Sequence, residues 1–179
     1  MILALSHFEI RARDLPRMED FYVRVLGFVV TDRSAEGTHP MVFLSTHPGE
    51  HHQIVLAAAR AGDFAAGSLD HIAFRATDLA ALRRHHRTLT AYGGLPVETV
   101  SHGTSWSVYF RDPEGNRLEV FVDTPWHVAQ PLRFAIDLAM SDAELIAWTE
   151  KQIAERADFQ PAQQWFAGLA ERLGRDATR

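Results

Sequence analysis

Residues 7–15 read His-Phe-Glu-Ile-Arg-Ala-Arg-Asp-Leu, and residues 71–79 read His-Ile-Ala-Phe-Arg-Ala-Thr-Asp-Leu. His, Arg, Ala, Asp and Leu coincide at identical offsets in the two stretches, which lie 64 residues apart (71 − 7). Self-similarity at a fixed period indicates a repeated structural unit. Each copy is typical of a strand that ends at an aspartate able to cap the following helix. The pair therefore predicts a duplicated unit that begins with a strand and a helix.

The two copies continue with the same order of elements. Helices are expected over 16–26 and 79–92, where Gly27 and Gly93-Gly94 would end them. Three strand-like stretches follow in each copy, over 28–33, 41–46 and 53–59, and over 96–101, 106–111 and 117–122. We therefore predict an α+β fold of two βαβββ modules, residues 1–62 and 63–124. Together they would form one domain with a curved, mostly antiparallel eight-stranded sheet and helices outside it.

Residues 125–179 form a C-terminal extension with a helical pattern. Ser141-Asp-Ala-Glu144 is a capping box and predicts a helix that runs to about Ala157. A second helix is expected from Pro161 to Leu173, because proline suits the first turn of a helix. Tryptophan, phenylalanine and leucine residues give these helices apolar faces. We expect the extension to pack on its own sheet or on a partner subunit.

The composition limits the chemistry that is possible. The chain has 179 residues, of which 46% are hydrophobic and 23% charged, as is usual for a globular protein. It contains no cysteine, which excludes disulfide frameworks, iron–sulfur clusters and thiol nucleophiles. It contains ten histidines, so that any metal ion would be held by imidazole or oxygen ligands.

The charge pattern argues against nucleic acid and membrane as partners. The formal net charge is −5, and the 18 Lys and Arg residues form no basic stripe. No apolar run approaches the roughly 20 residues that span a bilayer. The N-terminal residues lack the basic lead of a signal peptide and are typical of an early strand. We therefore expect a soluble, cytoplasmic protein.

A strand histidine that recurs in a duplicated unit is a candidate metal ligand, and His7 and His71 occupy this position. A third candidate comes from a predicted hairpin around the turn Asp112-Pro-Glu-Gly-Asn116. If Glu114 is at the centre of the turn, Tyr109 and Glu119 become direct cross-strand neighbours. Glu119 lies between Leu118 and Val120, where an inward-facing carboxylate is costly unless it is paired or bound to a cation. Two imidazoles and one carboxylate suit non-haem Fe(II), although manganese or zinc could use the same ligands.

The repeat, the His7, His71 and Glu119 spacing and the stretch Tyr-Phe-Arg-Asp-Pro-Glu-Gly-Asn-Arg-Leu-Glu together resemble the vicinal oxygen chelate superfamily. Its members include glyoxalase I, fosfomycin-resistance enzymes, methylmalonyl-CoA epimerase and type I extradiol ring-cleaving dioxygenases. The resemblance covers residues 3–124. Glyoxalase I implies a fourth ligand, a glutamate, at the position of Val55, and valine cannot ligate a metal. Fosfomycin-resistance enzymes share the three ligands but usually lack so long a C-terminal extension.

The extradiol dioxygenases imply three further residues, and each has a match. His52, in His51-His-Gln-Ile-Val-Leu56, resembles the active-site acid–base of their His-His strand, although His51 is an alternative for this role. Tyr109, ten residues before Glu119, matches the tyrosine that hydrogen-bonds the bound diol. His102, in His102-Gly-Thr-Ser, resembles their second substrate-binding histidine. The remaining five histidines are interpreted as loop, helix-surface or C-terminal residues: His39, His47, His85, His86 and His127.

The resemblance therefore implies an Fe(II)-dependent extradiol dioxygenase of aromatic catabolism that opens a small aromatic diol with O2. Many such relatives carry two pairs of modules, whereas this sequence has one pair, and we expect a homo-oligomer. One alternative is a metal-dependent thiol transferase, lyase or epimerase that uses the same three ligands. Another is a non-enzymatic drug-binding module like the bleomycin-resistance proteins, which generally lack the metal ligands.

Overall fold

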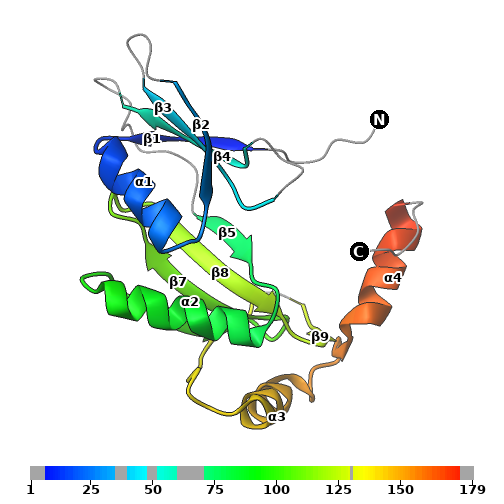
Figure 1. Cartoon of the computed structure of the whole chain (residues 1–179). Coiled ribbons are helices and arrows are strands. Elements are labelled where there is room, and N and C mark those ends of the chain that lie inside the picture. The colour runs from blue at the N-terminus through cyan, green and yellow to red at the C-terminus, as the bar shows by residue number, and fades with distance from the viewer. Residues whose placement is uncertain (1–6, 35–39, 48–51, 60–70, 130, 174–179) are drawn as a thin grey trace. The chain divides into compact units, whose positions relative to one another are not determined.

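A computed structural model describes residues 7–34, 40–47, 52–59, 71–129 and 131–173 (Figure 1). The chain divides into two compact units. Unit 1 comprises residues 1–71 and 111–117, and unit 2 comprises residues 72–110 and 118–179. Each unit is described by itself below.

Unit 1 contains a four-stranded sheet and one helix. Asp14 caps the helix through its side chain, which accepts a hydrogen bond of 3.0 Å from the Arg17 amide. Met18, Phe21 and Tyr22 form the buried face of the helix. The elements are β1 (Phe8–Ala12), α1 (Leu15–Arg24), β2 (Val29–Ser34), β3 (Met41–Ser45) and β4 (Ile54–Ala58). The sheet order is β1-β4-β3-β2, in which β1 and β4 are parallel and the other pairs are antiparallel.

Unit 2 repeats this plan. Asp78 caps the helix by accepting a hydrogen bond of 2.6 Å from the Ala81 amide, and Gly93 ends it with a φ of +72°. The elements are β5 (Ile72–Arg75), α2 (Leu79–Tyr92), β6 (Glu98–Ser101), β7 (Ser105–Arg111) and β8 (Arg117–Asp123). A short strand of the C-terminal extension, β10 (Phe134–Ala135), pairs with β6 and completes the order β10-β6-β7-β8-β5.

The α+β fold of two βαβββ modules is confirmed, but the hydrogen bonding of the strands differs from the prediction. Among the described strands, the ladders form a four-stranded and a five-stranded sheet rather than one continuous eight-stranded sheet. In each module the first strand pairs in parallel with the fourth strand, β1 with β4 and β5 with β8, and lies at one edge of its sheet. Each module therefore completes its own ladder.

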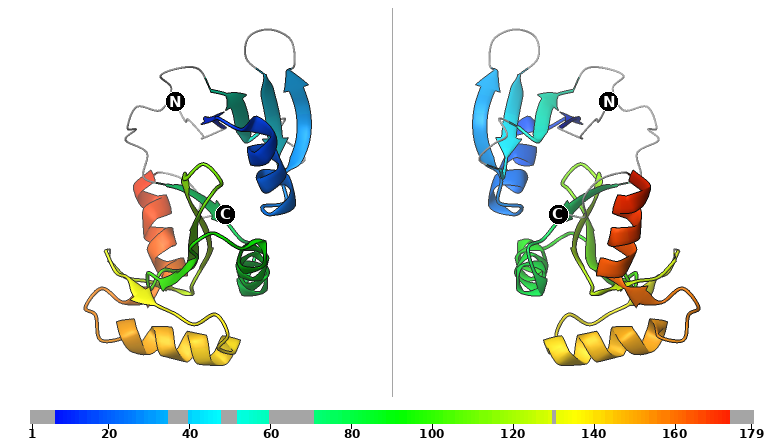
Figure 2. Two further views of the ribbon diagram at one scale, coloured as in Figure 1. Left: turned by 90° about the vertical axis from the view of Figure 1, so that its left-hand side faces the viewer. Right: turned by 90° about the vertical axis from the view of Figure 1, so that its right-hand side faces the viewer.

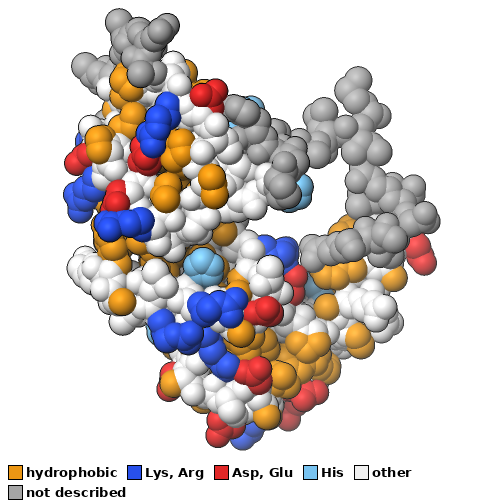
Figure 3. Space-filling model, viewed as in Figure 1, with side chains coloured by type: hydrophobic (Ala, Val, Ile, Leu, Met, Phe, Trp, Pro, Cys, Tyr) orange, Lys and Arg blue, Asp and Glu red, His pale blue; other side chains and the backbone are white. Residues whose placement is uncertain are grey.

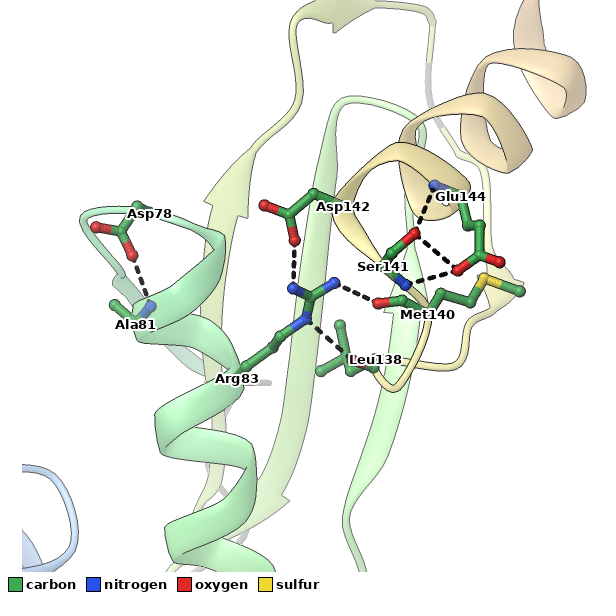
Figure 4. Close-up of polar contacts among 8 residues, drawn as sticks. All are labelled: Asp78, Ala81, Arg83, Leu138, Met140, Ser141, Asp142 and Glu144. Atoms are coloured by element: carbon green, nitrogen blue, oxygen red, sulfur yellow. Dashed lines mark hydrogen bonds and ion pairs between the residues drawn. The ribbon is translucent and has the colours of Figure 1, made fainter.

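The C-terminal extension is anchored to α2 by one arginine. The Arg83 Nε donates to the Leu138 carbonyl at 3.0 Å and its Nη2 donates to the Met140 carbonyl at 2.6 Å, while Nη1 forms an ion pair with Asp142 (Figure 4). The predicted capping box follows directly. The Ser141 amide donates to Glu144 at 2.8 Å, and the Glu144 amide donates to the Ser141 hydroxyl at 3.3 Å. These contacts fix the start of α3 (Asp142–Ile153).

The helices of the extension lie against unit 2 in different ways. α3 packs through Thr149, whose hydroxyl accepts a hydrogen bond of 2.8 Å from the Trp106 indole. It ends four residues before the predicted Ala157, because tight turns such as Arg156 N–H to Ile153 C=O replace the helical bonds. The strands β9 (Trp126–His127) and β11 (Gln160–Pro161) pair and lead into α4 (Ala162–Leu173). Figure 2 shows α2 and α4 on opposite sides of the β7 and β8 strands.

The described surface carries both signs of charge. On the face that Figure 3 draws, Lys and Arg side chains lie beside Asp and Glu side chains rather than in an unbroken basic stripe. No helix in the described ranges combines the length and the apolar character that crossing a membrane requires.

Candidate functional site

In unit 1, the structure brings two of the predicted site histidines together. His7 lies directly before β1 and is exposed, while His52 lies two residues before β4 and is half-buried. Because β1 and β4 are adjacent parallel strands, these positions are neighbours, and the two ring centroids are 4.4 Å apart. The Phe43 ring of β3 meets His52 edge-on at 5.2 Å. His51, the alternative to His52, lies outside the described residues.

In unit 2, the β7–β8 hairpin brings Tyr109 and Glu119 together. Near the turn, the Asp112 amide donates to the Asn116 carbonyl, and at the open end the Thr124 amide donates to the Thr104 carbonyl, both at 3.0 Å. Both bonds are centred on Glu114, so the same register holds at the two ends of the hairpin. In this register Tyr109 is opposite Glu119 in a pair without mutual backbone hydrogen bonds, the arrangement in which facing side chains are closest.

Glu119 and Tyr109 are buried as well as adjacent, and each residue is 7% exposed. A buried carboxylate is costly unless a cation or hydrogen-bond donors compensate for its charge. Carboxylate oxygen, together with imidazole nitrogen, forms the donor set that divalent iron, manganese and zinc accept. Glu119 would supply the carboxylate and the predicted ligands His7 and His71 the imidazoles, so the chemistry of these three side chains fits a divalent metal ion.

His102 holds the hydroxyl of Tyr109. Its Nδ1 lies 2.6 Å from the Leu132 carbonyl oxygen and its Nε2 lies 3.0 Å from the Tyr109 hydroxyl. A carbonyl can only accept, so the proton of a neutral imidazole is assigned to Nδ1 and Nε2 accepts the Tyr109 O–H. The Tyr109 hydroxyl therefore donates to His102, and its oxygen keeps the acceptor character of a phenol.

The glycine after His102 explains how the histidine is positioned. Gly103 has a φ of +77°, and a Cβ at this position would lie 2.8 Å from a methyl group of Val128. Only glycine therefore allows the extension to approach the chain so closely at this turn. The Gly103 carbonyl also accepts a hydrogen bond of 2.5 Å from the Thr124 hydroxyl. This packing places the extension, including Leu132, beside the His102 ring.

Sequence reasoning missed Arg133, which lies in the extension directly after Leu132. Its guanidinium lies 5.2 Å from the centroid of the Tyr109 ring, a cation–π arrangement. It also forms an ion pair of 2.6 Å with Glu98, the residue that faces Tyr109 across the β6–β7 ladder. The ion pair thus holds the cation over the phenol. A lone arginine outside any repeat or periodic pattern offers no signal from which this contact could be predicted.

The three predicted metal ligands come from both units. His7 and His71 belong to unit 1 and Glu119 belongs to unit 2. Within the part of the chain that the structure describes, no three His, Asp or Glu side chains are grouped closely enough to hold a metal ion. The assignment of His7, His71 and Glu119 as metal ligands therefore stays a prediction.

The strand registers show which residue of unit 1 corresponds to Glu119. Glu119 pairs with Ala73 on β5, and Val55 pairs with Glu9 on β1. Both members of the first pair lie 64 residues after their counterparts in the second, which is the offset of the sequence repeat. Val55 is therefore the structural counterpart of Glu119, and unit 1 carries no carboxylate at this position.

The turn that connects β7 and β8 is held in unit 1 by a buried polar contact. The Tyr22 hydroxyl of α1 donates to Asp112 at 3.3 Å, and Asp112 also accepts from the Glu114 and Asn116 amides. Burial raises the pKa of the Asp112 carboxyl, while these hydrogen bonds oppose the rise. Burial and the neighbouring Asp112 raise the pKa of the Tyr22 phenol. The contact therefore joins the turn to α1.

The chain belongs to the glyoxalase/bleomycin resistance protein/dioxygenase superfamily, whose family model matches residues 4–120. A curated relative, biphenyl-2,3-diol 1,2-dioxygenase 3 of Rhodococcus globerulus, is 35% identical over 125 residues, which cover 66% of this chain and 63% of the relative. This chain therefore aligns with less than two thirds of the length of that relative.

Solved structures show the same fold. A glyoxylase/bleomycin resistance protein/dioxygenase domain from Frankia sp. EAN1pec superimposes with a TM-score of 0.60 at 22% identity, over 69% of this chain and all of that one. A fosfomycin resistance protein from Listeria monocytogenes, solved with Mn(II) and sulfate, gives a TM-score of 0.55 at 18% identity, over 69% of this chain and 95% of that one. At these identities the likeness concerns the fold alone.

Proposed function

We propose that this protein is an extradiol dioxygenase that opens a catechol-type ring with O2 at Fe(II) held by His7, His71 and Glu119. The observation that carries the proposal is the arrangement around Tyr109, which is opposite the buried Glu119 and bonded to His102 through its hydroxyl. The 35% identity to a dioxygenase that is named for a catechol with a phenyl substituent supports the same chemistry.

The reaction inserts both atoms of O2 into the substrate. The carbon–carbon bond between one hydroxylated carbon and its unhydroxylated neighbour breaks, and the ring becomes an unsaturated oxo-acid that contains both oxygen atoms. Bound Fe(II) would supply a centre at which both diol oxygens and O2 meet and exchange electrons. Zinc cannot change oxidation state and would not serve this reaction, and manganese is the remaining alternative.

The residues of unit 2 would bind the diol and accept a proton from it. The Tyr109 oxygen can accept the proton of a substrate hydroxyl while its own proton passes to the Nε2 of His102. The Leu132 carbonyl, which accepts from Nδ1, would stabilise the imidazolium that results. His52 would be the second acid–base and donate a proton as oxygen is reduced. Its contact with the predicted ligand His7 supports this role.

The alternatives differ in observable ways. A glyoxalase-type centre would need a fourth ligand, a carboxylate, at position 55. This position is Val55, which cannot bind a metal, and this argues against a four-ligand site. A thiol transferase, lyase or epimerase would bind metal but consume no O2, and a drug-binding module would not require metal. We also propose that the protein forms a homo-oligomer.

The test is anaerobic reconstitution with Fe(II), measurement of the iron content, and then O2 uptake with a panel of catechols. We expect one iron per chain and uptake with at least one catechol. Stoichiometric iron without uptake from any catechol would reject ring cleavage and favour the other metal-dependent reactions. A failure to hold any metal would favour the binding module.

A further inference from the structure

One buried hydroxyl group on β7 has no hydrogen-bond partner among the described residues. It belongs to Ser107, which is 0% exposed. A buried hydroxyl without a partner costs free energy, so that nearly all buried hydroxyls in proteins are bonded. The other buried Ser and Thr residues of the described chain all form such bonds: Ser45, Ser101, Thr124 and Thr149. Ser107 is the exception among them.

Ser107 lies on the same face of its sheet as the predicted metal ligand Glu119. Side chains alternate along a strand, so Ser107 and Tyr109 share one face of β7. The register of the hairpin places Glu119 opposite Tyr109, and Glu119 is therefore a diagonal neighbour of Ser107. Diagonal neighbours lie about 7 to 8 Å apart, which is within reach of a long side chain. The Glu119 side chain can thus bring a carboxylate oxygen to the Ser107 hydroxyl.

The other neighbours of Ser107 on this face are apolar or already engaged. Val100 pairs with Ser107 on β6, and the hairpin register places Phe121 opposite it on β8. Asp123 is the second diagonal neighbour, but its carboxylate is exposed and forms an ion pair with an arginine of β5. Of these positions, only Glu119 combines an acceptor with burial, since it is 7% exposed.

The duplicated module shows that the hydroxyl and the carboxylate occur together. Val55 is the counterpart of Glu119 in unit 1. Met41 on β3 pairs with Ala57, two residues after Val55, and is therefore the diagonal neighbour of Val55. Met41 thus occupies the position that corresponds to Ser107. The module that lacks the carboxylate also lacks the hydroxyl.

We propose that Ser107 is a positioning residue whose hydroxyl donates a hydrogen bond to Glu119 when this carboxylate binds the metal ion. A carboxylate has two oxygens, so that one can bind a metal while the other accepts from Ser107. This bond would satisfy the buried hydroxyl and fix the orientation of the ligand. The inference rests on the proposed function, because it requires Glu119 to be a metal ligand, and it adds a residue that the predicted site does not contain.

The metal affinity of Ser107→Ala tests this role without catalysis. The probe is Mn(II) alone, and the EPR signal of the free ion gives its dissociation constant with the 179-residue chain. Hydrogen bonds to metal ligands typically contribute about 10- to 100-fold to metal affinity, so we expect the dissociation constant to rise about tenfold. Ser105→Ala is the matched control. It makes the same change on the same face of β7, one step farther from Glu119, and should leave the affinity unchanged.

The stability of the metal-free protein separates positioning from a structural role. The Ser107 hydroxyl has no partner to lose among the described residues, so Ser107→Ala should not lower the urea midpoint of the metal-free chain. A residue that serves only the packing of the sheet would instead lower the midpoint and the Mn(II) affinity together. That result would overturn the proposal, as would an unchanged Mn(II) affinity in Ser107→Ala.

A double variant tests the link between Ser107 and Glu119. Glu119→Ala should weaken Mn(II) binding more than Ser107→Ala does, and the two changes together should weaken it no further than Glu119→Ala alone. Fully additive losses would contradict the proposed bond. A wild type that binds no Mn(II), or that binds it no better than Glu119→Ala, would reject both the metal-ligand assignment and the role of Ser107. If the affinities follow the expectation but no catechol is cleaved by the Fe(II)-loaded protein, the proposed reaction fails and the role of Ser107 stands.

Discussion

The His102 imidazole bridges the C-terminal extension and the site, since its Nδ1 lies 2.6 Å from the Leu132 carbonyl and its Nε2 lies 3.0 Å from the Tyr109 hydroxyl. One ring thus fixes both the direction of the Tyr109 O–H and the position of the extension. The extension is therefore part of the site that we propose.

Tyr109→Phe tests the proton-accepting role of the phenol. The variant keeps the ring and its packing but removes the oxygen that would accept the substrate proton. Because general acid–base groups contribute about 10²- to 10⁴-fold, we expect kcat to fall by about 10²-fold or more. Oxygen uptake by the Fe(II)-loaded enzyme measures kcat, and iron content serves as the control. An unchanged kcat at full iron content would exclude the role.

His52→Ala separates acid–base function from metal binding. His52 contacts His7 but is not one of the three predicted ligands. We therefore expect turnover to slow by about 10²-fold or more while iron affinity changes far less. The comparison is His7→Ala, which should reduce iron affinity directly. Equal losses of turnover and iron affinity in His52→Ala would contradict the assignment.

Arg133→Gln tests the cation above the Tyr109 ring. Exposed cation–π contacts contribute about 0.5 to 1 kcal/mol, which corresponds to a two- to fivefold change in a rate or an affinity. We expect kcat/KM for the diol to fall by this factor and Arg133→Lys to restore part of it. Arg87→Gln, an exposed change on α2, is the matched control. A loss as large as that in Tyr109→Phe would indicate a direct role in catalysis.

Tyr22→Phe tests the contact that holds the β7–β8 turn. The change removes the hydrogen bond to Asp112 from a buried site, and we expect a loss of about 1 to 2 kcal/mol in the free energy of unfolding. Urea denaturation measures this loss. The same change at Tyr92, which is 39% exposed, should cost less than about 0.5 kcal/mol. Equal effects at the two tyrosines would show that the contact contributes nothing.

Asp112 also predicts a pH dependence of stability. Burial raises its folded-state pKa above the ordinary value of 3.8, so the folded protein takes up a proton at higher pH than the unfolded chain does. Above the folded-state pKa the carboxylate is charged, and its burial lowers the free energy of unfolding by the full amount. This loss declines as the pH falls toward 3.8. Wild type should therefore gain stability relative to Asp112→Asn over this window. If the difference in the free energy of unfolding between wild type and Asp112→Asn does not change with pH, the raised pKa of Asp112 is contradicted.

Much of the fold could be predicted because its signals are local or periodic. The aspartate caps, the terminating glycines and the 64-residue repeat predicted both modules, and the Asp112–Asn116 turn predicted the register that places Tyr109 opposite Glu119. The strand β10 could not be predicted, because two residues carry no alternation pattern. The division of the strands into two ladders also could not be predicted, since the pairing of β5 with β8 depends on contacts distant in sequence.

Two side-chain contacts of the candidate site join residues that the sequence singles out, while the metal ligands and the catalytic roles stay predictions. The contact of His7 with His52 and the bond between His102 and Tyr109 involve residues that the sequence singled out. The roles of Leu132 and Arg133 arise from a loop of the extension, where a backbone carbonyl and a single cation leave no sequence signal. The aromatic residues of α4 were predicted as an apolar helix face, and only the structure shows that they line a cavity.

The most direct test of extradiol cleavage compares O2 consumed with ring-opened product in the Fe(II)-loaded enzyme. With ¹⁸O2, one O2 should be consumed for each diol opened, and the product should carry label from both of its atoms. Iron-loaded protein that consumes no O2, or that consumes it without placing label in a ring-opened product, would contradict the account.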